Sequence, residues 1–333
     1  MKAAVYRATG PAREVLHVED LPVPEPGPGE VRVAVTLSGV NPTDWKGRAG
    51  FNGRPGPETF QVPHHDGAGR VDAVGPGVTG LAVGQRVWVF LAAFGNRYGT
   101  AAEFAVLPAE RVVPLPDGAS DELGACLGVP ALTAAHCLGG DPAAVEGRTV
   151  LVAGGAGAVG HFAIELAKQA GARVVTTVSS PAKAELARAA GADLVLDYRR
   201  DDVVARTREA VGEVHRVVEV ALGSNLEIDL AVLAGGGLVV VYAQEDEDPQ
   251  LPTYRLLSAN VSLRFVLLYG LSRRDLDRAV SWTSAATGAG ALSPLPITPF
   301  PLDRIVDAHL AVEGGAVGKA VVRPGEPVAP GHG

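Results

Sequence analysis

The 333-residue chain has only two cysteines, Cys126 and Cys137. Two thiols cannot form a disulfide framework or a four-thiolate zinc lobe. So few cysteines are typical of a reducing compartment such as the cytoplasm. Basic residues are also in short supply, because 29 Lys and Arg oppose 37 Asp and Glu, giving a net charge of −8. An acidic chain without a basic stripe is a poor nucleic-acid binder, so we expect no nucleic-acid partner.

Long apolar runs are absent as well. Nowhere do about 18 consecutive apolar residues occur without a charge or a glycine cluster, so we expect no membrane-spanning helix. The first residues, Met1–Arg7, lack the apolar stretch of a signal peptide. Glycine and proline, in contrast, are abundant: 42 Gly and 25 Pro indicate many turns between short strands. These features predict a soluble cytoplasmic protein.

The length suggests about two domains of roughly 150 residues each. The first third of the chain is β-rich, because short apolar runs are bounded by Gly or Pro, and we expect no helix there before about residue 120. Short strands at this spacing are typical of a barrel or sandwich-like unit. The predicted strands are 2–6, 31–37, 69–74, 86–90 and 102–106.

From Thr149 onward, apolar runs alternate with amphipathic helical segments. This alternation predicts a parallel sheet covered on both faces. The predicted strands are 149–153, 173–178, 194–197, 216–220, 237–242 and 261–268, and the helices between them are 159–170, 181–190, 201–211 and 225–233. Two further helices, 275–286 and 302–311, flank a proline-rich stretch and precede a last strand at 320–322.

A glycine-rich turn joins the first strand of this α/β region to its first helix. Read from Gly155 to Gly160, the turn is G-x-G-x-x-G. Such glycines let the backbone approach a pyrophosphate, which the free N–H groups of the helix N-terminus bind. The motif alone could also reflect tight packing. Its place between a strand and a helix of a βαβαβ series favours a dinucleotide site.

The end of the second strand distinguishes the two nicotinamide dinucleotides. NAD sites carry an acidic residue there that binds the ribose 2′-hydroxyl. Here the strand ends in Val178-Ser179-Ser180, and Lys183 follows. Hydroxyls beside a cation suit a 2′-phosphate, although Lys183 could simply be a solvated lysine. The sequence favours NADPH.

Motifs along nearly the whole chain resemble the zinc-free quinone oxidoreductase (zeta-crystallin-like) branch of the medium-chain dehydrogenase/reductase superfamily. The resemblance implies a GroES-like, mostly β catalytic domain and a Rossmann doubly wound parallel-sheet domain. We place the first at residues 1–123 and 269–333 and the second at 124–268. The motifs are Met1–Val5, Pro26–Val31, Gly39–Asp44, Val74–Val78, Val83–Val87, Leu127–Ala134, Gly191–Asp193 with Tyr198, Glu313–Gly315 and Gly318–Lys319.

The same resemblance implies site residues. Asn41 and Asp44 would be catalytic, with Asn41 donating its amide N–H to the substrate carbonyl oxygen and Asp44 positioning backbone or nicotinamide. Trp45, Phe51 and Tyr269 would line the substrate pocket between the domains. The cofactor would contact Pro42, Thr43, Thr133, Gly155, Ala156, Gly157, Ala158, Val159, Gly160, Ser179, Lys183, Tyr198, Gly223, Ala243, Leu268 and Lys319.

Catalytic zinc is not expected. Zinc-dependent relatives have Cys where Asn41 stands and a further ligand near Val129, and neither Asn nor Val provides a thiolate. His64-His65-Asp66 could suggest a metal, but hydrogen bonding to loop backbone is the simpler interpretation. Most relatives have Gly in place of His64, so this turn is unusual.

The function implied is hydride transfer from NADPH to a quinone or other conjugated carbonyl. Relatives that reduce enoyl substrates use a tyrosine as proton donor, and those positions here read Lys46 and Asn52. A 2-enoyl reductase, which would have to use Lys46 or His65 as donor, and a non-catalytic NADPH-binding protein remain the alternatives. The apolar run 261–268 at the expected sheet edge pairs between subunits in relatives, which implies a homodimer.

Overall fold

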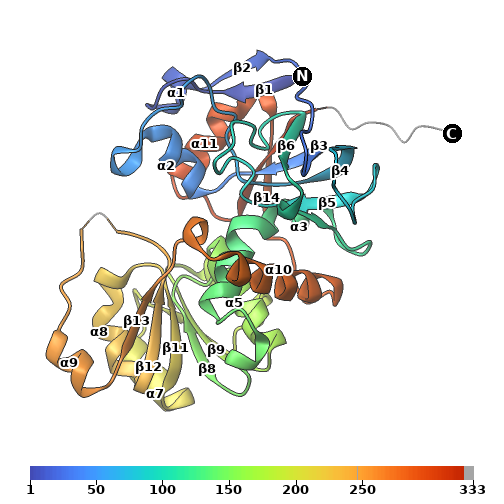
Figure 1. Cartoon of the computed structure of the whole chain (residues 1–333). Coiled ribbons are helices and arrows are strands. Elements are labelled where there is room, and N and C mark those ends of the chain that lie inside the picture. The colour runs from blue at the N-terminus through green and yellow to red at the C-terminus, as the bar shows by residue number, and fades with distance from the viewer. Residues whose placement is uncertain (246, 326–333) are drawn as a thin grey trace. The chain divides into compact units, whose positions relative to one another are not determined.

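The structure is a computed structural model that describes residues 1–245 and 247–325. The chain folds into two compact units (Figure 1). Unit 1 comprises Met1–Val129 and Pro294–Gly333, and unit 2 comprises Pro130–Ser293. The second boundary lies 25 residues beyond the expected 268, because helix α10 (Arg273–Gly288) packs against α4 (Leu132–Cys137) and belongs to unit 2. Trp282 of α10 also donates to Gln169, at 3.0 Å between Nε1 and Oε1.

Unit 1 is built around a seven-stranded sheet that includes strands from both ends of the chain. Its longest member, β3 (Glu30–Gly39), runs antiparallel to β4, β6 and β15. Val31, Val33 and Val35 alternate along β3 and contribute to a buried core, as half-buried strands require. The other strands are β4 (Asp66–Val74), β5 (Arg86–Val89), β6 (Phe104–Pro108), β7 (Val112–Pro114), β14 (Ile297–Pro301) and β15 (Lys319–Arg323), and β1 (Lys2–Val5) pairs separately with β2 (His17–Asp20).

The expectation of no helix before residue 120 was wrong. Helix α2 (Pro42–Ala49) follows β3 directly, with Asn41 at its N-cap and Pro42 at its first position. It ends at Gly50, whose φ of 77° suits glycine. The helix has few apolar residues, so hydrophobic periodicity could not reveal it. The other helices of unit 1 are α1 (Ala12–Val15), α3 (Asp121–Cys126) and α11 (Ile305–Glu313).

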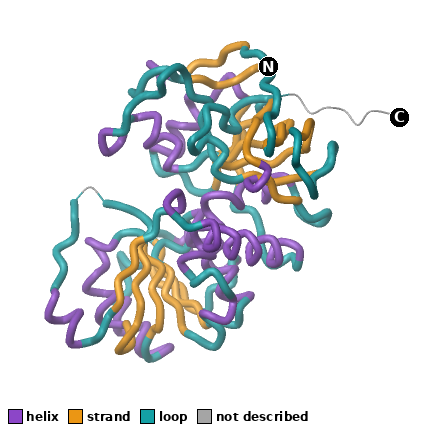
Figure 2. The backbone as a smooth tube through the Cα atoms, viewed as in Figure 1, coloured by secondary structure: helices purple, strands orange, loops and turns teal. Residues whose placement is uncertain are grey.

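Unit 2 contains a six-stranded, fully parallel sheet in the order β10-β9-β8-β11-β12-β13. Its strands lie side by side, with helices around them (Figure 2). Leu151, Val175 and Val217 lie at the centre of its buried core, as apolar strands of a covered parallel sheet do. The strands are β8 (Thr149–Val152), β9 (Arg173–Val178), β10 (Leu194–Asp197), β11 (Val214–Glu219), β12 (Leu233–Val241) and β13 (Ser262–Phe265). The remaining helices are α5 (Ala158–Gln169), α6 (Pro181–Ala189), α7 (Val203–Val211), α8 (Leu222–Val232) and α9 (Thr253–Ser258).

The predicted combination of a mostly β domain with a parallel-sheet α/β domain is confirmed. β13 forms one edge of the sheet in unit 2, as expected for the apolar run 261–268. Within residues 1–245 and 247–325, no helix is both long and apolar enough to cross a membrane.

Candidate active site

The glycine-rich turn of unit 2 connects β8 to α5, whose N-cap is Gly157. Two of its glycines are required by close packing. A Cβ at Gly155 would lie 2.1 Å from Oγ1 of Thr176, and one at Gly160 would lie 2.4 Å from the carbonyl oxygen of Gly154. No side chain caps the N-terminus of the 12-residue α5, so its first N–H groups are free to bind an anion. The turn therefore fits the pyrophosphate of a dinucleotide.

Ser179, Lys183 and Tyr198 come together beyond the carboxyl ends of β9 and β10. The ammonium of Lys183, in the first turn of α6, donates to Oγ of Ser179 at 3.1 Å. The neighbouring strands β9 and β10 pair in parallel, and the half-exposed Tyr198 donates its backbone N–H to Val178 at 3.1 Å. A hydroxyl, an ammonium and a phenol at the end of β9 are donors that suit a 2′-phosphate.

Four further expected cofactor residues lie in unit 2. Thr133 is buried in α4, Ala243 follows β12, and Leu268 lies in the turn 268–270 together with Tyr269. Gly223, near the start of α8, donates its backbone N–H to a carboxylate oxygen of Glu245 at 2.5 Å. This acidic side chain thus contacts the start of α8, where a cofactor contact was expected.

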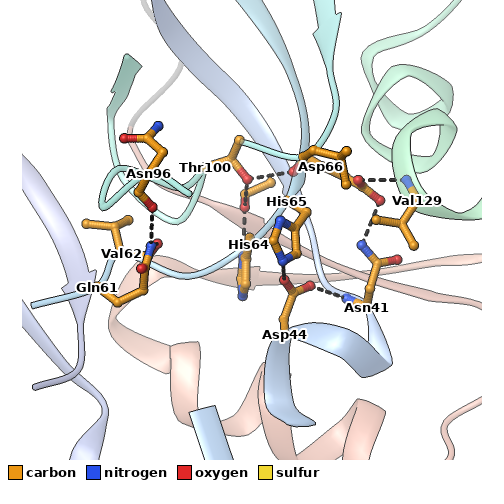
Figure 3. A network of polar contacts seen from close by, with 12 residues as sticks. Asn41, Asp44, Gln61, Val62, His64, His65, Asp66, Asn96, Thr100 and Val129 are labelled. Atoms are coloured by element: carbon orange, nitrogen blue, oxygen red, sulfur yellow. Dashed lines mark hydrogen bonds and ion pairs between the residues drawn. The ribbon is translucent and has the colours of Figure 1, made fainter. Parts of the chain in front are cut away.

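A buried polar cluster in unit 1 joins Asn41, Asp66 and Lys319. Figure 3 shows the contact between Asn41 and Asp66. Nδ2 of Asn41 donates to Oδ2 of Asp66 at 2.6 Å, and Oδ1 of Asn41 accepts from the ammonium of Lys319. That ammonium lies 3.6 Å from Oδ2 of Asp66, whose other oxygen accepts the backbone N–H of Val129 at 2.8 Å. All three side chains are at most 3% exposed. Lys319 was expected to contact the cofactor, but here its ammonium binds within unit 1.

Asp44 lies next to this cluster. Its Oδ2 accepts the backbone N–H of Asn41 at 2.6 Å, and its Oδ1 lies 3.9 Å from Nε2 of His65 (Figure 3). Burial, and then the negative charge of Asp66, raise the pKa of Asp44 to about 8. Burial lowers the pKa of His65 to about 3, so this imidazole is neutral at physiological pH.

These contacts bear on the roles expected of two residues. The amide of Asn41 is oriented by Asp66 and Lys319, and its role as donor to the substrate oxygen stays a prediction. Asp44 was expected to position backbone or nicotinamide. A carboxyl group with a pKa of about 8 is largely protonated at pH 7 and is matched to general-acid chemistry.

A chain of hydrogen bonds lies behind the cluster and begins at His309 of α11. Nε2 of His309 lies 3.0 Å from Nε2 of His64, Nδ1 of His64 lies 2.7 Å from Oγ of Ser38, and Ser38 lies 2.7 Å from Thr100. Thr100 donates to the carbonyl oxygen of Asp66 at 2.6 Å. Because Thr100 donates its hydrogen to Asp66, it must accept from Ser38. Ser38 must then accept from Nδ1 of His64, and Nε2 of His64 must accept from Nε2 of His309.

His64 also has an unusual backbone, with a φ of 77° that favours glycine. Burial lowers the pKa of both His64 and His309, so both rings are neutral. The expected hydrogen bonding to backbone holds for Asp66, which accepts the N–H of Val129, whereas His64 bonds to the side chains of Ser38 and His309.

The side chains of Trp45 and Phe51 pack beside Lys46. Its ammonium lies 4.7 Å from the centroid of the Phe51 ring and 5.9 Å from that of Trp45, within the range of cation–π interactions. Pro42 and Thr43 form the exposed and half-exposed first turn of α2.

Known proteins match both units. Residues 27–117 match the alcohol dehydrogenase GroES-like domain, and residues 158–285 match the zinc-binding dehydrogenase family. A quinone oxidoreductase of Pseudomonas aeruginosa is 38% identical over 69% of this chain and 69% of its own length. Another, of Lama guanicoe, is 29% identical over 93% of both chains. A mycobacterial protein solved in complex with NADPH is 32% identical and covers 97% of this chain and 100% of its own, with a TM-score of 0.83.

This chain belongs to the quinone oxidoreductase branch of the medium-chain dehydrogenase/reductase superfamily. The resemblance drawn from its motifs is confirmed, and the protein is an oxidoreductase.

The donor set of unit 1 differs from a metal site, although one matched family is named for zinc. Among the residues that the structure describes, no group of three or more His, Cys, Asp or Glu is arranged to hold a metal ion. At the positions of the zinc ligands stand the amide of Asn41 and the backbone of Val129, neither of which provides a thiolate. The ammonium of Lys319 beside Asp66 would also repel a cation.

Several members of this oxidoreductase's polar network were not anticipated. Ser38, Thr100 and His309 gave no signal, because their partners are 26 to 245 residues away in the sequence. Asp66 was noted only as part of a histidine-rich segment. The glycine-like position of His64 was the one available sign of unusual structure there.

Proposed function

We propose that this oxidoreductase transfers hydride from NADPH to a quinone or another conjugated carbonyl compound without zinc. The observation that carries the proposal is the Asn41–Asp66–Lys319 cluster. In the region where zinc-dependent relatives have metal ligands, this cluster has an amide, a carboxylate and an ammonium. These three groups hydrogen-bond or pair with one another. The quinone oxidoreductase relatives support the substrate class.

The choice of NADPH rests on unit 2. Ser179, Lys183 and Tyr198 would bind the 2′-phosphate, and the N–H groups at the start of α5 would bind the pyrophosphate. The mycobacterial relative in complex with NADPH supports the same choice. When bound, the cofactor supplies the hydride.

Asp44 would supply the proton. Its carboxyl group is protonated at pH 7, and the N–H of Asn41 holds one of its oxygens in place. One hydride and one proton complete the two-electron reduction of a quinone, and the carboxylate of Asp44 then regains its proton from water. Asn41 acts as a positioning residue, because it holds both Asp44 and Asp66.

The raised pKa of Asp44 also keeps 2-enoyl reduction as a second candidate function. An enoyl reductase needs a proton donor, and this chain has Lys46 and Asn52 where relatives have tyrosines. The raised pKa of Asp44 provides such a donor. Lys46 is less suited, because its ammonium is held over Phe51.

The test is an assay of nicotinamide absorbance with NADPH, a panel of small quinones and 2-enoyl thioesters, each with and without EDTA. We expect quinone-dependent NADPH oxidation that EDTA leaves unchanged. Turnover with enoyl thioesters only would favour the second candidate. Activity abolished by EDTA and restored by zinc would contradict the zinc-free mechanism, and no turnover would favour a non-catalytic NADPH-binding protein.

We also propose a homodimer formed through β13. Phe265 and Leu267, at and just beyond the end of this edge strand, are 65% and 67% exposed, and an apolar edge of this kind is usually paired or covered. A cytoplasmic location is proposed as well, since Cys126 and Cys137 are both free thiols.

A further inference from the structure

A cavity lined by basic side chains lies in unit 2, away from the glycine-rich turn. It has a volume of about 280 Å³ and is lined chiefly by Arg148, His215, Arg216 and residues 234–238 of β12. These residues lie at or just before the amino ends of β8, β11 and β12. The glycine-rich turn follows the carboxyl end of β8. The strands are parallel, so the cavity and the turn lie at opposite ends of the strands.

The positive charges around this cavity are not neutralised. In the described part of the chain, neither Arg148 nor Arg216 forms an ion pair with a carboxylate, and the same holds for Arg264. Arg216 is partly buried, and its Nη1 donates to the carbonyl oxygen of Cys137 at 3.3 Å. Burial lowers the pKa of Arg216, and the charges of Arg264 and Arg148 lower it further. Like charges gathered in a chain of net charge −8 indicate a place for an anion.

The polar side chains at the cavity keep hydrogen-bond donors for a ligand. Nδ1 of His215 accepts the backbone N–H of Thr149 at 3.1 Å, so the ring has its donor at Nε2. The guanidinium groups of Arg148 and Arg216 offer donors only. On the opposite wall, nothing lies within 4 Å of the place where a Cβ would stand at Gly235 or Gly236. That wall therefore leaves room for a ligand.

We propose that this cavity binds a phosphate group, either as the free ion or as the terminal group of a phosphorylated small molecule. Arginine forks match the geometry of phosphate oxygens, and the fixed donors of the cavity leave no acceptor side chain to oppose them. The volume is close to the lower end of small-molecule pockets, about 300 Å³, so it accommodates more than the ion alone. The site is separate from the one that binds the cofactor.

Calorimetric titration of the full-length protein tests this proposal. NADPH is kept at saturation so that the cofactor's own phosphate sites are filled. The probes are inorganic phosphate and glycerol 3-phosphate, with chloride at equal ionic strength as the blank. The variants are Arg148→Gln, Arg216→Gln and, as a matched control, Arg173→Gln, which removes an exposed arginine outside the cavity.

We expect saturable binding of phosphate by the wild type and a Kd at least about tenfold higher in Arg148→Gln and Arg216→Gln, since each loses a charge-assisted contact. Arg173→Gln should bind as the wild type does. Tighter binding of glycerol 3-phosphate identifies a phosphorylated molecule as ligand, and tighter binding of inorganic phosphate identifies the free ion. Among the described residues, the Arg148 side chain has no hydrogen bond or ion pair that Arg148→Gln would break, so this variant remains informative if Arg216→Gln fails to fold. No saturable binding of either probe, or equal binding by Arg148→Gln and the wild type, overturns the proposal.

Discussion

The carboxyl groups of Glu219 and Asp229 shift each other's pKa in the interior of unit 2, where both side chains are fully buried. Oε1 of Glu219 accepts from the backbone N–H of Ala221 and, at 2.9 Å, from Nδ2 of Asn225. These donors stabilise Glu219 as a carboxylate, so Asp229 keeps the one proton that the pair shares. Burial, and then the charge of Glu219, raise the pKa of Asp229 to about 9.

This pair predicts a loss of stability in alkaline solution. The folded protein keeps the proton of Asp229 up to about pH 9, whereas the unfolded chain releases it near the ordinary value of 3.8. The free energy of unfolding therefore falls as pH rises toward 9, by at most about 1.4 kcal/mol per pH unit from this group. In Asp229→Asn this contribution should vanish. Urea unfolding at pH 7, 8 and 9 measures it. Equal slopes in Asp229→Asn, the exposed control Asp117→Asn and the wild type would contradict the shared proton.

Cofactor preference should depend on Lys183. Its ammonium stands beside Ser179 at the expected 2′-phosphate position, and one charge-assisted contact is worth about 1.5–3 kcal/mol. Lys183→Ala should therefore raise the KM for NADPH about tenfold or more and leave that for NADH nearly unchanged. Initial rates with both cofactors decide this. Equal effects on the two would show that Lys183 does not recognise the phosphate.

The sequence predicted most of unit 2 because each strand is an apolar run between turn residues. Sequence-based prediction failed where interactions other than the local hydrophobic pattern determine the structure. The proline-rich stretch before residue 301 contains β14, since an edge strand tolerates Pro299 and Pro301. The proton on Asp44 was missed for a different reason: its pKa depends on burial beside Asp66, 22 residues away in the sequence. The contact of Lys319 with Asp66 was also missed, because no local pattern reveals it.

The proposed proton donor predicts a particular pH profile. Asp44 donates only when protonated, so kcat with a quinone that needs a proton in the slow step should fall as pH rises through about 8. Asp44→Asn should lower kcat about a hundredfold and remove that limb. The exposed Asp20→Asn serves as control. A wild-type-like profile in Asp44→Asn would exclude Asp44 as the donor.

Asn41→Ala should also lower kcat strongly while leaving NADPH affinity little changed. The substitution leaves Asp66 and Lys319 without their shared partner and frees a buried ammonium. Steady-state kinetics beside a direct NADPH titration separate the two effects. Unchanged turnover would show that the cluster does not support the reaction.

The left-handed backbone at His64 allows a comparison of two variants. Both His64→Gly and His64→Ala lose the hydrogen bonds to Ser38 and His309. At a φ of 77°, alanine costs about 1 kcal/mol more than glycine. His64→Gly should therefore be the more stable of the two by about that amount in chemical denaturation. The reverse order would argue that the backbone relaxes when the ring is removed.

The dimer proposal predicts that charge on the apolar edge yields monomers. Leu267→Lys should lower the molar mass measured by light scattering at micromolar concentration to that of one chain. Val83→Lys introduces the same charge at a similarly exposed position of unit 1 and should remain dimeric. A monomeric wild type would refute the proposal.

The Asn41–Asp66–Lys319 cluster has a consequence for how the protein is made. It joins the N-terminal part of unit 1 to β15, which is synthesised after all of unit 2. A ribosome therefore synthesises the whole 130–293 segment before it adds Lys319, and chains generally fold in the order in which they are made. Until β15 arrives, Asp66 and Asn41 lack their ammonium partner. Premature termination before residue 319 would thus leave unit 1 without β15, although the sequence of unit 2 would be complete.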